Sequence, residues 1–121
     1  VFLSGGIGGA SEERARQLNI DKCITNVKDK GKELKKIQKD LGFTKEETLY
    51  VGDDINDLVV KDYVNLLITP NDASNYIKRK AHLILNQNGG EGAIRELAEK
   101  ILDAKGVLKK ITQGGWKNLN N

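Results

Sequence analysis

The residues with the clearest chemical potential follow a short apolar run in the middle of the chain. The run at residues 48–51 favours a β-strand and ends at a glycine. Three carboxylates follow within five residues, those of Asp53, Asp54 and Asp57. Carboxylates this close repel one another unless a cation neutralises them, and Mg²⁺ prefers such hard oxygen ligands. The pattern indicates either a magnesium site or an acidic turn that caps the next helix.

Apolar runs alternate with helix-like segments along the whole chain. This alternation predicts an α/β fold, a Rossmann-like parallel sheet with helices on both faces. Such folds bind ligands at the carboxyl ends of their strands, which is where the three carboxylates would lie. We expect strands within residues 1–3, 20–27, 48–51, 64–68 and 82–85, helices within 11–19, 30–41, 56–62, 73–80 and 91–104, and a capped turn at 44–47.

The composition is that of an ordinary soluble domain. The 121 residues hold 20 Lys and Arg against 17 Asp and Glu, a net charge of +3. This mild, interleaved charge with few aromatic residues argues against a nucleic-acid partner. The apolar runs fall short of the about 20 residues that a membrane span needs. The single Cys23 rules out a disulfide within these residues, so we expect a cytoplasmic protein with no membrane partner.

The ends of the sequence predict a core and a tail. Residues 1–106 carry the alternating pattern, whereas residues 107–121, which include Trp116, lack clear periodicity. We expect the latter to be a tail that is mobile or docks on a partner. The sequence begins inside an apparent strand at Val1 and contains no methionine. We therefore expect the amino-terminal part of the domain to be missing from it.

A glycine-rich loop, Ser-Gly-Gly-Ile-Gly-Gly, occupies residues 4–9. Its glycines let the backbone turn tightly and bring N–H groups to an anion, which favours a phosphate cradle. It lacks both Gly-Lys-Ser/Thr and an in-register Gly-x-Gly-x-x-Gly. A flexible turn and a nucleotide-binding loop remain the alternatives.

Three positions gain meaning when they are taken together. Ser4 follows a strand, Lys30 opens a helix, and Gly-Asp-Asp-Ile-Asn-Asp follows a further strand at residues 52–57. This order resembles the haloacid dehalogenase superfamily of phosphohydrolases. The detail, including residues 89–96, is similar to its capless branch, the 3-deoxy-D-manno-octulosonate 8-phosphate phosphatases and their sialic acid relatives. The likeness runs from Val1 to about Gly106.

The resemblance implies a Mg²⁺-dependent phosphomonoester hydrolase of lipopolysaccharide biosynthesis. Its substrate would be a sugar-acid phosphate, cleaved through an aspartyl-phosphate. Capless relatives form homotetramers, so we expect an oligomer as well. The resemblance implies catalytic roles for Ser4, Lys30 and Asp54, substrate contacts from Ser4, Gly5, Gly6, Arg14 and Lys30, a metal ligand at Asp53, and supporting positions at Asp54 and Asp57 that orient the lysine, metal waters or the loop.

This sequence departs from the family pattern at two points. The nucleophile of the family is the first Asp of an Asp-x-Asp motif upstream of the serine strand, and these residues lack it. We expect the motif to lie in the missing part; the alternative is a non-catalytic assembly domain, related to that of acylneuraminate cytidylyltransferases. Gly6 stands where relatives often carry Arg or Glu, which leaves the sugar open. Arg14 either grips a substrate carboxylate or pairs with the neighbouring Glu12 or Glu13.

Overall fold

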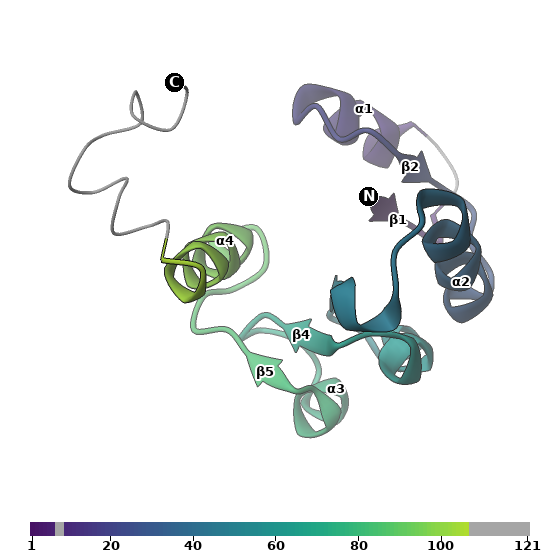
Figure 1. The fold of residues 1–121 in the computed structure, drawn as a ribbon. Coiled ribbons are helices and arrows are strands. Elements are labelled where there is room, and N and C mark those ends of the chain that lie inside the picture. Colours follow the sequence, from purple (N-terminus) through teal and green to yellow (C-terminus); the bar gives the residue numbers. More distant parts are fainter. Residues whose placement is uncertain (7–8, 107–121) are drawn as a thin grey trace. The chain divides into compact units, whose positions relative to one another are not determined.

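The computed structural model describes residues 1–6 and 9–106, and Figure 1 shows the path of the chain. Strands and helices alternate, as the sequence predicts. The elements in chain order are β1 (Phe2–Leu3), α1 (Ala10–Gln17), β2 (Cys23–Ile24), α2 (Lys30–Leu41), the 3₁₀ helix η1 (Lys45–Glu47), β3 (Leu49–Val51), the 3₁₀ helix η2 (Ile55–Tyr63), β4 (Leu66–Thr69), α3 (Asn75–Lys80), β5 (Leu83–Ile84) and α4 (Ala93–Ala104).

The chain forms two compact units. Unit 1 comprises residues 1–50 and 56–65, and unit 2 comprises the remaining described residues. Unit 1 contains a parallel pair of strands, β1 and β2, in which Leu3 lies opposite Ile24. Ser4 continues this pairing beyond the strand, because its backbone N–H donates to Ile24 O at 2.9 Å. The pairing therefore fixes Ser4 at the carboxyl end of β1.

Helix α2 is the long helix of unit 1, and its ends follow local rules. The Asp29 side chain accepts a backbone N–H of the first turn at 3.0 Å, which caps the helix. Gly42 ends it with a φ of 74°, a left-handed conformation that glycine adopts without strain. The 3–4 spacing of Leu34, Ile37 and Leu41 in the sequence predicts one buried face, and Leu34 and Ile37 are indeed buried. Leu41 is 47% exposed, because it lies in the last turn, where the chain turns away.

A three-stranded sheet has the strand order β3–β4–β5. Unit 2 contains β4, β5 and Val51, the last residue of β3. Strands β4 and β5 are parallel, and the Gly52 N–H donates to Ile68 O at 3.0 Å at the end of β3. The amphipathic helix α4 covers the core of this unit. That core consists of Ile68, Leu85, Ala93 and Leu97, with Val51, Leu66, Leu83 and Ile101 packed against it.

Several element boundaries differ from the prediction by one to three residues. Helix α3 begins at Asn75 because the Ser74 hydroxyl caps it, and α4 begins at Ala93 after Gly92, whose φ is 104°. The short helix predicted after β3 is present, and it is the 3₁₀ helix η2. The predicted tail, residues 107–121, lies outside the described residues.

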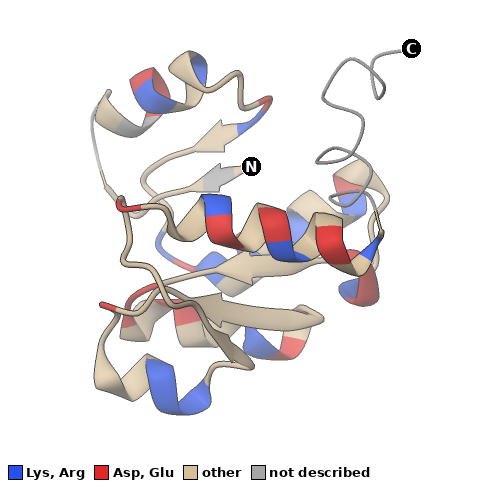
Figure 2. Cartoon of the chain, turned by 90° about the vertical axis from the view of Figure 1, so that its left-hand side faces the viewer, with Lys and Arg blue, Asp and Glu red and all other residues tan. Residues whose placement is uncertain are grey.

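The helices differ in how charged residues are distributed along them, and their length and hydropathy decide whether one could cross a membrane. Basic and acidic residues are interleaved along α4 (Figure 2), whereas the charged residues of α3 are all basic. Across residues 1–6 and 9–106, no helix is both long enough and apolar enough to span a bilayer.

Candidate functional site

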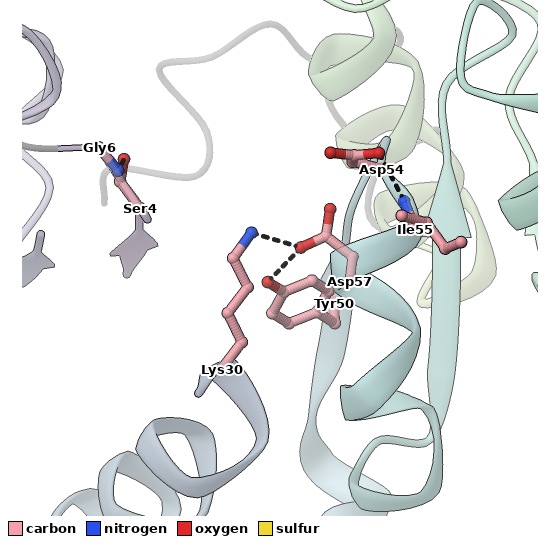
Figure 3. A network of polar contacts seen from close by, with 7 residues as sticks. All are labelled: Ser4, Gly6, Lys30, Tyr50, Asp54, Ile55 and Asp57. Atoms are coloured by element: carbon pink, nitrogen blue, oxygen red, sulfur yellow. Dashed lines mark hydrogen bonds and ion pairs between the residues drawn. The ribbon is translucent and has the colours of Figure 1, made fainter. Parts of the chain in front are cut away.

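An ion pair in unit 1 joins two of the residues singled out from the sequence. The Lys30 ammonium donates to Asp57 Oδ1 at 2.7 Å, and the Tyr50 hydroxyl donates to the same oxygen at 2.9 Å (Figure 3). The Asp57 side chain is 5% exposed and that of Lys30 is 19% exposed. The carboxylate is therefore nearly removed from water, and charged and polar donors from two other elements compensate for its desolvation.

The first turn of α2 is placed against η2 by a residue without a side chain. A Cβ on Gly31 would lie 3.2 Å from a ring carbon of Tyr63 and 3.4 Å from Val59 O. Because this glycine is small, the start of α2 approaches η2 closely enough for Lys30 to reach Asp57. A cation in the first turn of a helix opposes the helix dipole, so helix stability alone does not account for a lysine here.

Ser4 is held at the end of β1 by hydrogen bonds on three sides. Besides its bond to Ile24, its carbonyl accepts the Val27 N–H at 2.9 Å. Its hydroxyl oxygen accepts the Gly6 N–H at 3.1 Å. The loop therefore folds back on the serine, and the N–H of Gly6, which we expected to contact an anion, donates to Ser4 in this conformation.

The two carboxylates that directly follow β3 belong to unit 2. Both Asp53 and Asp54 are exposed, in contrast to Asp57. The Asp54 side chain accepts the backbone N–H of Ile55 at 2.7 Å, and the carbonyl of Asp53 accepts the N–H of Ser74 at 3.3 Å. Asp54 thus shapes the turn, and the loop after β4 helps to fix the backbone of Asp53.

The donor set can be tested against the predicted magnesium ion. Within the described part of the chain, no three side chains of His, Cys, Asp or Glu are grouped so as to hold a metal. Asp53 offers an exposed hard oxygen ligand at a strand end, and Mg²⁺ commonly binds through one or two carboxylates and several waters. Asp53 fits the ion as one ligand, while these residues do not form a complete protein cage.

Two arginines, Arg14 and Arg95, lie on helix surfaces. Arg14 on α1 is exposed, and on that helix it is Arg16 that pairs with Glu13. A substrate contact from Arg14 stays a prediction. Arg95 pairs with Glu99 one turn along α4 at 3.3 Å, a local ion pair on the helix surface.

Glu96 is an anchoring residue that sequence reasoning missed. Its carboxylate accepts the backbone N–H groups of Asn86 and Gln87 at 2.8 Å each, and Lys100 lies 3.8 Å away. The hydrogen bond from Asn86 is the main cause that lowers the pKa of the Glu96 carboxyl below 4.5; partial burial opposes it, and Gln87 and Lys100 add to the lowering. The glutamate ties the loop after β5 to α4.

Tyr50 is the second residue that sequence reasoning missed. As part of an apolar, β-prone run, it already has a structural explanation. The available signal was its position, two residues before Gly52 at the end of a strand that leads into the acidic loop. A hydroxyl there can reach groups at the same sheet edge.

Known proteins resemble this chain in sequence and in structure. A family model described as haloacid dehalogenase-like hydrolase matches residues 15–97. The chain is 33% identical over 112 residues to the 3-deoxy-D-manno-octulosonate 8-phosphate phosphatase of Yersinia pestis, a match that covers 93% of this chain and 60% of that protein. This chain thus spans about 60% of the length of the curated relatives it matches.

Solved structures agree with this match. The cobalt-bound deoxy-D-mannose-octulosonate 8-phosphate phosphatase of Haemophilus influenzae superposes with a TM-score of 0.82 at 31% identity, covering 88% of this chain and 62% of that one. The 3-deoxy-D-manno-octulosonate 8-phosphate phosphatase of Moraxella catarrhalis, in complex with magnesium, phosphate and KDO, superposes with a TM-score of 0.83 at 27% identity, covering 93% and 67%. The fold class and the resemblance predicted from the sequence are confirmed. The chain belongs to the family of haloacid dehalogenase-like hydrolases.

Proposed function

We propose that this chain is part of a Mg²⁺-dependent phosphatase acting on a sugar-acid phosphate, such as 3-deoxy-D-manno-octulosonate 8-phosphate. The observation that carries the proposal is the part-buried ion pair of Lys30 with Asp57, at the start of α2. An ammonium held there is suited to neutralise a phosphoryl group. The relatives from Yersinia pestis and Moraxella catarrhalis support the choice of substrate, since their names specify this phosphate or its sugar.

Phosphoryl transfer depends mainly on positioning and on stabilising charge. In the proposed reaction Lys30 offsets the charge of the phosphate and of the attacking carboxylate, and Asp57 holds the ammonium in place. The Ser4 hydroxyl and the Gly5 N–H donate to phosphate oxygens. Mg²⁺, bound with the help of Asp53, would supply charge neutralisation between phosphate and nucleophile. In this proposal an aspartate upstream of these residues attacks phosphorus and forms an aspartyl-phosphate, while the P–O bond to the sugar breaks. The sugar oxygen takes up a proton and leaves, and water then hydrolyses the aspartyl-phosphate to release phosphate.

The remaining site residues have supporting roles in this proposal. Asp54 orders the turn after β3 through its bond to the Ile55 N–H and thereby orients Asp53. Gly6 lies beside Ser4, whose hydroxyl oxygen accepts its N–H at 3.1 Å, and it contributes to the substrate-binding loop. Arg14, exposed on α1, binds the carboxylate of the sugar acid.

The assembly and the location of the protein are part of the same proposal. We infer a cytoplasmic homotetramer. Large apolar side chains on the surface support an interface between subunits; examples are Ile94, which is 64% exposed, and Val59, which is 53% exposed. Light scattering of the full-length protein at micromolar concentration is expected to give the mass of a tetramer, and a monomer would contradict this part of the proposal.

The experiment that tests the function measures phosphate release by the full-length protein from a panel of sugar phosphates, with and without Mg²⁺. We expect Mg²⁺-dependent release that is fastest with a sugar-acid phosphate. Asp53→Asn is expected to lower the affinity for Mg²⁺, measured by calorimetry, by about 100-fold or more, since even indirect supports of metal ligands cost 10–100-fold. Asp62→Asn, on an exposed residue of η2, is the matched control.

A full-length protein that binds neither Mg²⁺ nor phosphate would contradict the proposal. Such a result would favour the alternative, a non-catalytic assembly domain.

A further inference from the structure

We propose that Tyr50 is a positioning residue, which anchors Asp57 and through it fixes the ammonium of Lys30 for binding phosphate. The proposal rests on the function proposed above. Its observation is the shared acceptor: Asp57 Oδ1 receives the lysine Nζ at 2.7 Å and the tyrosine hydroxyl at 2.9 Å (Figure 3).

The side chains of Asp57, Lys30 and Tyr50 are buried or partly buried, so the loss of either donor carries a free-energy cost. Because the Asp57 side chain is only 5% exposed, water contributes little to its hydration, and its oxygens depend on donors from the protein. Removing one donor from a buried carboxylate leaves part of its desolvation cost uncompensated. The carboxylate then reorients toward other donors, and its partner Lys30 moves with it.

The packing of Tyr50 does not explain its hydroxyl. Tyr50 lines a mostly apolar pocket of about 260 Å³ in unit 1, together with Leu3, Leu34 and Ile37. A phenylalanine would keep the aromatic ring and lose only the hydroxyl, so apolar surroundings alone do not call for a tyrosine. The hydroxyl donates to Asp57 at 2.9 Å, in the manner of tyrosines whose polar end finds a hydrogen-bond partner at the edge of an apolar site.

The two donors to Asp57 differ in charge, and this difference suits Tyr50 to the role of a neutral anchor. Lys30 brings a positive charge on a long, flexible stem, whereas Tyr50 is neutral and has only two side-chain torsions. The tyrosine thus restrains Asp57 without offering a second positive charge to the substrate. An ammonium has three N–H donors, and the bond to Asp57 occupies one of them. Fixing that one bond fixes the directions of the other two.

The test uses Tyr50→Phe in the full-length protein, with Tyr63→Phe as the matched control. Tyr63 also lies in unit 1 and is partly buried, and its ring contacts Lys35 at 4.1 Å from the centroid, a contact that phenylalanine retains. Both variants lose one hydroxyl and keep the ring. Thermal unfolding checks that both are folded.

Two readouts are measured on each variant. The first is acetylation of lysines by limiting acetic anhydride, read out residue by residue with mass spectrometry; it needs no turnover. We expect Tyr50→Phe to raise the labelling of Lys30 several-fold relative to the other lysines, since the amine is less firmly held. The second is steady-state phosphate release, in which Tyr50→Phe is expected to lower kcat about tenfold with little change in KM. Tyr63→Phe is expected to leave both unchanged.

The outcomes separate this inference from the proposed function. Unchanged Lys30 labelling in Tyr50→Phe overturns the inference, whether or not the protein releases phosphate. A rise in labelling at all lysines alike also overturns it, because that pattern reports general loosening. A selective rise at Lys30 in a protein that releases no phosphate supports the positioning of Lys30 by Tyr50 and overturns the proposed phosphatase.

Discussion

Lys30 and Asp57 lie 27 residues apart in the sequence, and the lysine Nζ is 2.7 Å from Asp57 Oδ1. They come from different elements, α2 and η2, which approach each other at Gly31. The pair is part-buried, and buried ion pairs are weak sources of net stability. Burying Lys30 and Asp57 costs free energy of folding. A role for Lys30 in binding phosphate, a second negative partner, gives a reason for keeping the pair.

Removing the charge of Asp57 is predicted to destabilise the protein. In Asp57→Asn the ammonium of Lys30, 19% exposed, loses its counter-charge. Breaking a fully buried pair costs 3–5 kcal/mol, and partial exposure of the lysine reduces this to about 2 kcal/mol. Urea unfolding of the full-length protein measures the change. An unfolding midpoint equal to that of the wild type would show that the pair does not contribute as described, and Asp62→Asn, at an exposed position, serves as control.

Glu96 is predicted to make stability depend on pH. Because its folded pKa is lowered, chiefly by the hydrogen bond from the Asn86 N–H, the contribution is fully present above the ordinary value of 4.5. It is lost as the pH falls through the lowered folded pKa and the carboxylate takes up a proton.

Glu96→Gln isolates this contribution. The free energies of unfolding of wild type and variant are expected to differ most at neutral pH and to converge as the pH falls below the lowered folded pKa of Glu96. Urea unfolding at a series of pH values provides the comparison, with Glu99→Gln on the exposed side of α4 as control. A difference that stays constant over the whole pH range would contradict the assigned role.

His82 is predicted to stabilise unit 2 through its ring. The ring Nδ1 accepts the backbone N–H of Leu67 at 2.8 Å, and the His82 N–H donates to Leu67 O at the same distance. Leu67 is fully buried, so its N–H finds little water when the ring is removed. We expect His82→Ala to cost about 1–3 kcal/mol in thermal or urea unfolding. His82→Asn, whose side-chain oxygen can accept the same bond, is expected to recover part of this loss.

Local rules predicted much of the fold from the sequence. The start of α2 at Lys30, its end at Gly42 and the turn closed by Thr44 and Glu47 all depend on residues within a few positions of one another. The exposure of Leu41 could not be predicted in the same way, because periodicity does not show where a neighbouring element ends. The 3₁₀ form of η2 likewise depends on tertiary packing.

The candidate site was predicted unevenly, for a physical reason. Asp53 and Asp54 were found because carboxylates cluster after a strand, a signal that sequence carries directly. Tyr50 was missed because a tyrosine in a strand needs no further explanation. Glu96 was missed because its partners are backbone N–H groups, which every residue possesses and no motif marks. The approach of Lys30 to Asp57 followed from the family resemblance, since spacing alone does not join two residues so far apart.

The central claim, that Lys30 is held in place to neutralise a phosphoryl group, is tested most directly by one comparison. Phosphate release from 3-deoxy-D-manno-octulosonate 8-phosphate is measured for the full-length wild type, Lys30→Met and Lys32→Met in the presence of Mg²⁺. Lys32 is exposed on the same helix and loses the same charge. We predict that Lys30→Met lowers kcat/KM by about 100-fold or more, as for removal of one charge-stabilising donor, and that Lys32→Met stays within about threefold of wild type. Equal activity of Lys30→Met and Lys32→Met would contradict the account.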